Sequence, residues 1–155
     1  MIRGFPGISD QDEAIRTRWP AFRLLRQEGR AALWRGPLRP LMATYEVQVT
    51  YQVPLAVERL DPVRQQPRVR VMSPRLRERR GDPEGDLPHV YWDDREHPSL
   101  CLFDIETAEW TPSDLIAATT LPWAADWLAC YEGWRATGEW TGGGRHIPAP
   151  SQAET

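Results

Sequence analysis

The sequence predicts an α+β fold, in which an antiparallel β-meander is flanked by an N-terminal helix and by C-terminal helices. Three patterns predict this class: helical spacing of apolar residues near the N-terminus, strict alternation in the middle, and an aromatic helical stripe near the C-terminus. At 155 residues the chain suits a single domain with a substantial core. We expect that domain to span residues 1–146 and to be followed by a flexible tail at 147–155.

The first helix is predicted to begin near Ser9 and Asp10, because small polar and acidic side chains favour a helix N-terminus. Apolar residues then recur at helical spacing and form a stripe of Ile15, Trp19, Phe22 and Leu25. Pro20 interrupts this stripe, so it either kinks the helix or restarts it. Gly29 is the expected end of the segment.

The clearest strand is predicted at residues 44–53, where apolar residues at odd positions alternate with polar residues at even positions. Such alternation is typical of a strand with one buried and one solvated face. Shorter strands are predicted at 31–35 and at 68–72, the latter with its two valines facing inward. The stretch at 75–88 is rich in Arg, Pro and Gly and indicates a surface loop.

Two helices are predicted near the C-terminus. Residues 111–114 (TPSD) combine a capping threonine, a proline suited to the first helical position and an aspartate three residues after the cap. A second helix is predicted to begin near Pro122 and to end at Gly138, since glycine is favoured at helix C-termini. Its apolar stripe consists of Trp123, Trp127, Tyr131 and Trp134.

Composition and charge argue against several classes of protein. The net charge of -3 and the pI near 5.6 give no electrostatic reason to expect a nucleic-acid partner. Two cysteines do not make a disulfide scaffold, and no Cys or His spacing suggests a metal site, so we expect neither a metal nor a cofactor. The chain shows no signal peptide and no run of ~20 apolar residues, which predicts a cytoplasmic protein without a membrane span.

Cys101 lies in the segment 97–103 (HPSLCLF), and residues 109–112 (EWTP) follow it closely. A cysteine before a short apolar run, followed by Trp-Thr-Pro, resembles the active-site segment of ubiquitin-conjugating (UBC-like) enzymes. The stretch 127–144 is similar to the C-terminus of bacterial UBC-like proteins from antiphage operons, among them the CBASS systems built around a cGAS-like nucleotidyltransferase. The resemblance spans roughly residues 40–146.

The resemblance implies a UBC-like fold and a transferase in which Cys101 carries a protein C-terminus as a thioester and passes it to an amine. The carried C-terminus would be that of a cGAS-like nucleotidyltransferase. Without a Gly-rich nucleotide-binding unit, the chain resembles the standalone type, and the sequence leaves open whether a separate activating enzyme is needed. All 19 basic residues are Arg. This suits a carrier that hands acyl groups to lysine, although a GC-rich genome gives the same bias.

In the family, a His-Pro-Asn motif upstream of the cysteine is linked to the attack of the amine on the thioester, and this chain departs from it. His89 stands near the expected start of the motif, and Asp93 or Asp94 stands near the expected Asn. His97 is too close to Cys101 to belong to the same element. The oxyanion role then falls to a backbone N–H or to His97, and either aspartate is a candidate to orient or deprotonate the amine. The alternative for both histidines is a structural role in the loop.

Three hypotheses about function stay open. The first is the cysteine transferase, and the second is a catalytically inactive UBC-fold module that only recruits the nucleotidyltransferase, as the missing Asn suggests. The third is a cysteine hydrolase that pairs Cys101 with His89 or His97, but no hydrolase signature surrounds the cysteine. We expect Cys101 to be accessible at the edge of a groove, and Cys130, which falls in the aromatic helix, to be buried and inert.

Overall fold

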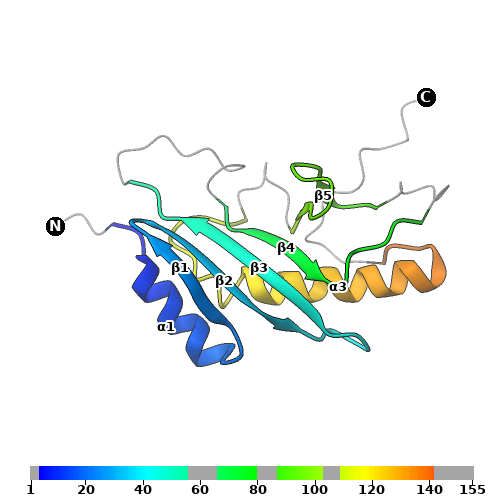
Figure 1. Cartoon of the computed structure of the whole chain (residues 1–155), viewed down its shortest axis with the longest axis horizontal. Coiled ribbons are helices and arrows are strands. Elements are labelled where there is room, and N and C mark those ends of the chain that lie inside the picture. Colours follow the sequence, from blue (N-terminus) through cyan, green and yellow to red (C-terminus); the bar gives the residue numbers. More distant parts are fainter. Residues whose placement is uncertain (1–3, 56–65, 80–86, 103–108, 142–155) are drawn as a thin grey trace.

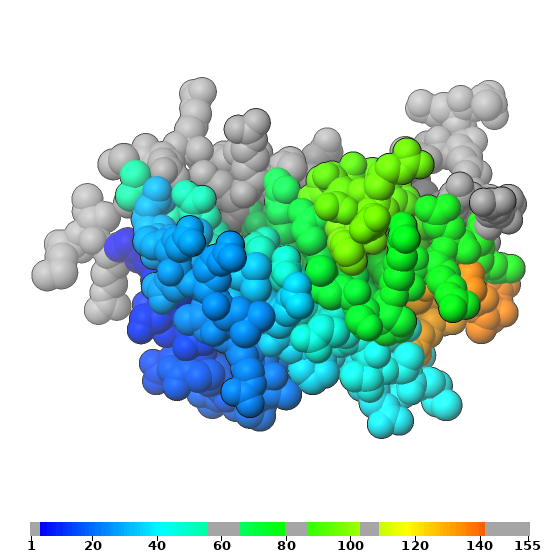
Figure 2. All heavy atoms as spheres, in the orientation of Figure 1, coloured from blue at the N-terminus to red at the C-terminus, as the bar shows by residue number. Residues whose placement is uncertain are grey.

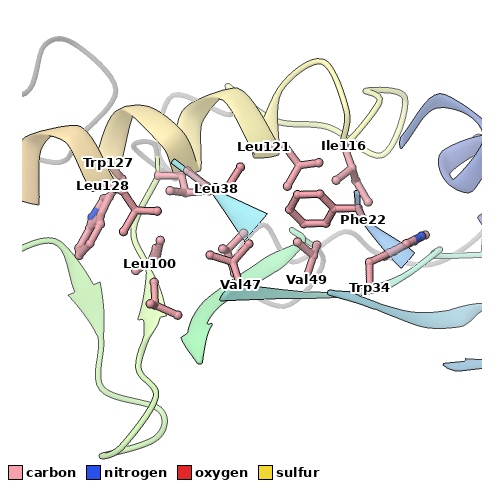
Figure 3. Close-up of a cluster of buried hydrophobic side chains, with 14 of the residues drawn as sticks. Phe22, Trp34, Leu38, Val47, Val49, Leu100, Ile116, Leu121, Trp127 and Leu128 are labelled. Atoms are coloured by element: carbon pink, nitrogen blue, oxygen red, sulfur yellow. The ribbon is translucent and has the colours of Figure 1, made fainter. Parts of the chain in front are cut away.

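The computed structural model describes residues 4–55, 66–79, 87–102 and 109–141. Within these ranges the chain forms one six-stranded sheet and two helices, which lie on the same face of the sheet (Figures 1 and 3). The α+β class predicted from the sequence is confirmed. Neither described helix is long and apolar enough to cross a membrane. The elements are α1 (Ile8–Arg18), β1 (Arg23–Glu28), β2 (Ala31–Leu38), β3 (Tyr45–Gln52), β4 (Arg68–Ser73), β5 (Val90–Tyr91), β6 (Ser99–Leu100) and α3 (Thr120–Thr137).

The sheet has the strand order β1-β2-β3-β4-β6-β5, and all neighbouring strands are antiparallel. The strands β1 to β4 follow one another in sequence, so they form a meander of four strands where the sequence predicted three. Beyond β4, the short strand β6 pairs through Ser99 with Arg70, and β5 forms the edge of the sheet. The segment that carries Cys101 therefore lies at this edge.

The N-terminal helix is shorter than predicted. It ends at Arg18, and Trp19 caps it by donating its backbone N–H to a carbonyl of the last turn at 2.7 Å. The strand β1 replaces the predicted continuation of the helix, which was wrong. Pro20 explains the break, because it has no N–H for the helical ladder and its ring clashes with the preceding turn. Gly29, with a φ of 57°, forms the turn into β2.

The strand β3 confirms the clearest prediction from the sequence. Its residues Tyr45, Val47, Val49 and Tyr51 are buried, and the residues between them are more exposed. The predicted strand at 68–72 is confirmed as β4, and β2 continues beyond its predicted end to Leu38. Because side chains alternate along each strand, one face of the sheet packs against the helices and the other faces solvent.

The helix predicted from 111–114 does not form, and this stretch makes turns instead. The Asp114 carboxylate does accept the Thr111 N–H at 2.8 Å, as a helix cap would. However, the Gln11 side chain in α1 donates to the Asp114 carbonyl at 3.0 Å and accepts the Ile116 N–H at 2.9 Å. These tertiary hydrogen bonds take the backbone groups that a helix would pair with each other.

The C-terminal helix α3 begins at Thr120, close to its predicted start. It ends at Thr137 and is capped by Gly138, whose φ of 83° is the left-handed conformation expected at a helix C-terminus. On the side of α3 that faces the sheet, Trp127 and Leu128 are fully buried and lie near Leu100 of β6 (Figure 3). The hydrophobic core thus extends to the residue that directly precedes Cys101.

Candidate active site

Cys101 directly follows β6 and continues the pairing of that strand with β5. The two strands pair Ser99 with Tyr91, and the Cys101 N–H then donates to the His89 carbonyl at 2.9 Å. Because side chains alternate, Cys101 is expected on the same face as Ser99 and Tyr91. The contact between the side chains agrees with this, since the Cys101 thiol donates to the Tyr91 hydroxyl with an Sγ–Oη distance of 3.5 Å. A short hairpin ladder therefore fixes the position of the thiol.

The two cysteines differ in exposure, in the opposite sense to the prediction. Cys101 is 4% exposed, whereas Cys130 in α3 is only partly buried. The expectation that Cys101 is the accessible thiol is therefore wrong, because the hairpin buries the residue and places its thiol against the Tyr91 hydroxyl. Burial, and then the charge of Asp126, raise the pKa of the Cys130 thiol, which gives its predicted inertness a physical basis.

His89 links the candidate cysteine to α3 through its backbone. Its carbonyl accepts both the Cys101 N–H and the Trp127 Nε1–H, each at 2.9 Å. Its φ of 56° lies in the left-handed region, which residues other than glycine rarely adopt. The His89 ring lies 4.8 Å from the ring of Trp140, measured between centroids. These contacts support the structural alternative for this histidine.

Asp93 is the centre of an ion-pair cluster that joins the cysteine hairpin to β4. Its carboxylate accepts two hydrogen bonds from the Arg70 guanidinium, at 2.8 and 2.9 Å, and one from Arg68 at 3.2 Å. It also accepts the backbone N–H of Ser99 at 3.1 Å and the Ser99 hydroxyl at 2.9 Å. Burial alone would raise the pKa of Asp93, but the hydrogen bonds from Arg70 and Ser99 outweigh it and lower the pKa to about 2.

We expect Asp93→Asn to lower the free energy of unfolding at pH 7 by about 1 kcal/mol, because the pKa falls from 3.8 to about 2 on folding and solvent screens the ion pairs of this exposed residue. The folded-state pKa is depressed, so this contribution is complete above about pH 4 and is lost as the pH falls toward about 2. Urea unfolding between pH 7 and pH 3 measures it, with Glu46→Gln on the same sheet face as the control. If the difference in free energy of unfolding between the variant and the wild type stayed constant below pH 4, the lowered pKa of Asp93 would not be its cause.

Asp94 and His97 close the loop between β5 and β6. One Asp94 carboxylate oxygen accepts the backbone N–H groups of His97 and Glu96, at 2.9 and 2.8 Å. These hydrogen bonds, from His97 first and then from Glu96, lower the pKa of Asp94, whose side chain is exposed to solvent. The His97 carbonyl in turn accepts a hydrogen bond from Arg70 at 2.7 Å. The two candidate aspartates therefore bind different partners, Asp93 the sheet and Asp94 its own loop.

Tyr91 and Arg70 are the residues that sequence reasoning did not single out. Arg70 holds both Asp93 and the His97 carbonyl, and Tyr91 contacts the thiol. The available signal was the antiparallel pairing itself, which brings a residue ten positions before the cysteine beside it. Among the described residues, no group of three or more His, Cys, Asp or Glu side chains could hold a metal ion.

A small hollow of about 90 Å³ opens between the hairpin of β5 and β6 and the start of β4. Tyr91, Asp93 and Ser99 line one side of it, and Gln66 and Arg68 line the other, with Pro67 and Leu100 completing the wall. The hollow therefore lies on the face of the sheet that carries the Asp93 cluster. Cys101 does not line the hollow, although Tyr91, which does, contacts Sγ of Cys101 through its hydroxyl.

Comparison with known protein families gives a match over most of the chain. A family described as Type II CBASS E2 protein matches residues 11–147. The matched region contains Cys101, the hairpin that positions it, and the aromatic helix α3. A comparison with curated proteins gives no match. Since the family match covers far more than half of the sequence, the chain belongs to the family of type II CBASS E2 proteins.

Proposed function

We propose that this protein is a ubiquitin-conjugating-like cysteine transferase of an antiphage CBASS system. In this proposal Cys101 carries the C-terminus of a cGAS-like nucleotidyltransferase as a thioester and transfers it to an amine in the cytoplasm. The observation that carries the proposal is the position of Cys101 in a chain that belongs to the E2 family. The hairpin of β5 and β6 holds its thiol 3.5 Å from the Tyr91 hydroxyl at the edge of the sheet. The proposal includes the standalone type, in which a separate enzyme activates the C-terminus.

The proposed reaction has two acyl-transfer steps. In charging, the Cys101 thiolate attacks the carbonyl carbon of an adenylated C-terminus, a C–S bond forms, and AMP leaves with the electron pair of the broken C–O bond. In discharge, an amine attacks the thioester carbonyl, a C–N bond forms, and the C–S bond breaks as the thiolate leaves. The extra proton of the amine passes to a base or to water. Both steps pass through an oxyanion that needs a hydrogen-bond donor.

The Tyr91 hydroxyl is suited to be that donor. In the uncharged protein the thiol donates to it at 3.5 Å. Once the sulfur is acylated it has no proton to donate. The Tyr91 O–H can then turn and donate to the carbonyl oxygen of the thioester. Because Cys101 is 4% exposed, charging also requires the side chain of Tyr91 or the adjacent backbone to move aside. The proposal therefore assigns Tyr91 both a covering role and a donor role.

The test of this function is formation of a covalent adduct. The protein is mixed with the nucleotidyltransferase of its operon, the separate activating enzyme and ATP, and the products are separated on gels with and without reducing agent. We expect an adduct that disappears on reduction, because a thioester is cleaved by added thiol. If the two proteins bind each other without any thiol-sensitive adduct, the inactive recruiting module is the correct function instead.

Asp93 and Asp94 are proposed to assist discharge more than charging, since only discharge must handle protons of an amine. Acid–base assistance is typically worth ~10²–10⁴ in rate, and a carboxylate with a lowered pKa is a weak base, so we expect an effect of at most ~10². Charging and discharge are measured separately for Asp93→Ala and Asp94→Ala. Equal losses of rate in charging and discharge would show that the residue only holds the loop in place. For Asp93 this structural role is the direct alternative, because the residue forms ion pairs with Arg68 and Arg70.

A further inference from the structure

His89 has a backbone conformation that residues other than glycine rarely adopt. Its φ of 56° lies in the left-handed region. In this conformation its carbonyl accepts the backbone N–H of Cys101 and the Nε1–H of Trp127, each at 2.9 Å. One carbonyl therefore joins the candidate nucleophile to α3. A rare conformation of this kind persists only where the surrounding structure imposes it, so contacts around His89 have to supply the constraint.

Trp140, which lies two residues beyond the glycine that caps α3, packs against the ring of His89. The centroids of the two rings are 4.8 Å apart. Trp140 also lies edge-on to Trp127, with the centroids 5.1 Å apart, and its ring centroid is 6.4 Å from that of Trp134. Trp140 therefore contacts both the side chain of His89 and the tryptophan that donates to the His89 carbonyl.

The C-terminal end of α3 is itself held in place by the segment 75–79. The Arg79 guanidinium donates to the Trp134 carbonyl in the last turn of the helix at 3.1 Å. In Figure 2 the strands hide most of α3, but its C-terminal end (orange) is visible beside green residues of this segment. Gly138, with its left-handed φ of 83°, then turns the chain so that Trp140 reaches the hairpin of β5 and β6.

The hydrogen bond from Cys101 to His89 helps to fix the thiol beside Tyr91. The strands β5 and β6 pair at only two positions, so the bond from the Cys101 N–H to the His89 carbonyl adds a third step to a short ladder. If His89 left its conformation, this step would be lost and the end of β6 would be released. That end carries the Sγ atom that contacts the Tyr91 hydroxyl at 3.5 Å.

We propose that Trp140 is a positioning residue for Cys101. Trp140 keeps His89 in its left-handed conformation, and the His89 carbonyl holds the backbone of Cys101 so that Sγ stays beside the Tyr91 hydroxyl. The consequence for the reaction rests on the proposed transferase function, in which this placement sets the rate of discharge. The placement itself is a property of the free protein and can be measured without any partner.

The first test measures how fast iodoacetamide alkylates Cys101. Every variant also carries Cys130→Ala, so that all labelling occurs at Cys101. We expect Trp140→Ala to react about fivefold faster than its parent, because release of the hairpin exposes a residue that is 4% exposed, and fivefold is the factor for loss of one modest contact. An unchanged rate in a Trp140→Ala variant that urea unfolding shows to be folded would overturn the proposal.

Trp19→Ala is the matched control for Trp140→Ala. Trp19 is also a partly buried tryptophan packed against the core, but it lies at the end of α1 and donates its Nε1–H to the Ala117 carbonyl. We expect Trp19→Ala to lower the free energy of unfolding without changing the alkylation rate of Cys101. An equal acceleration in both variants would show that loss of stability alone exposes the thiol, and the proposal would fail.

Two substitutions at His89 separate its backbone conformation from the packing of its ring. Alanine and glycine both remove the ring, but only glycine adopts a φ near 56° without strain. We expect His89→Ala to accelerate alkylation as Trp140→Ala does, and His89→Gly to restore a rate close to that of the parent. Neither variant removes a tryptophan, so this comparison holds even if Trp140→Ala does not fold. Equal rates in the two His89 variants would overturn the proposal.

The double variant with His89→Gly and Trp140→Ala tests whether Trp140 acts through His89. With glycine at this position the conformation no longer depends on Trp140. We therefore expect the added Trp140→Ala change to alter the alkylation rate by less than about twofold, the size of ordinary deviations from additivity. If Trp140 acts instead through α3 alone, the same acceleration will appear in both backgrounds, and the proposal fails.

Single-turnover discharge of the purified thioester connects the placement of the thiol to the reaction. We expect Trp140→Ala to slow discharge by up to ~10²-fold, because a misplacement of about 1 Å at a reacting group costs that order in rate. Trp19→Ala should discharge at the wild-type rate. If the wild type forms a thioester and Trp140→Ala discharges it normally, the positioning role fails and the transferase function stands. If the wild type forms no thioester, the transferase function fails, and the alkylation rates alone decide whether Trp140 places Cys101.

Discussion

We expect the Cys101→Ala variant to form no thiol-sensitive adduct with the nucleotidyltransferase, while Cys130→Ala forms it at the wild-type level. The sulfur of Cys101 is the atom that bonds to the carried C-terminus in the proposed reaction, and alanine offers no nucleophile in its place. Cys130 lies in α3, and burial followed by the charge of Asp126 raises the pKa of its thiol, so it supplies little thiolate. The comparison is made on non-reducing gels after identical incubation.

Loss of the adduct in Cys101→Ala has to be separated from loss of the fold. The residue is 4% exposed, so removing its sulfur leaves a small void and costs about 1 kcal/mol. The backbone hydrogen bond to the His89 carbonyl is kept, because alanine retains the N–H. Urea unfolding should therefore show a folded variant of slightly reduced stability. An adduct of normal yield in a folded Cys101→Ala variant would exclude the transferase function proposed for this cysteine.

The parts of the fold that could be predicted from the sequence are those in which a short pattern of apolar and polar residues repeats over many positions. The strand β3 alternates over its whole length, and α3 repeats its aromatic stripe over several turns before Gly138. The prediction for the N-terminal segment was wrong because Phe22 and Leu25 fit the spacing of a helical stripe as well as that of a strand. The chain resolves this ambiguity at Pro20, where the helix has to stop.

The second error has a different cause. The stretch at 111–114 has good local signals for a helix start, and the Thr111 N–H does bond to the Asp114 carboxylate. What prevents the helix is Gln11, which lies more than one hundred positions away in sequence and bonds to the backbone on both sides of Leu115. A buried amide that satisfies backbone groups from another element cannot be read from a local pattern.

The candidate site divides in the same way. Cys101 was proposed from a motif, because its neighbours in sequence carry the signal. The burial of Cys101 could not be predicted from the motif, because it follows from the pairing of β5 with β6 and from the core beneath Leu100. The ion pairs of Asp93 with Arg68 and Arg70 depend on the pairing of β6 with β4, which joins segments well separated in the chain. Residue types were predictable here, but their partners required the tertiary structure.

The largest effect expected from a residue other than the nucleophile is that of Tyr91→Phe. Removing one oxyanion donor from an acyl-transfer site typically lowers the rate ~10²–10³-fold, so discharge of the charged protein should slow by that order. Phenylalanine keeps the ring, which leaves the covering of Cys101 and the hairpin pairing intact. Single-turnover discharge from the purified thioester measures the rate. Tyr45→Phe is the matched control, because it removes a hydroxyl that bonds to Glu132 in α3 rather than one at the thiol.

A second readout separates a donor from a residue that only shapes the hairpin. A donor to the oxyanion acts on the reaction and not on the fold, so Tyr91→Phe should slow discharge while its free energy of unfolding changes by at most about 1 kcal/mol, the value of one hydrogen bond. A residue that only shapes the hairpin would show a larger loss of stability in urea unfolding. If discharge of Tyr91→Phe matches the wild type, Tyr91 is not the donor, and the oxyanion role returns to a backbone N–H or to His97.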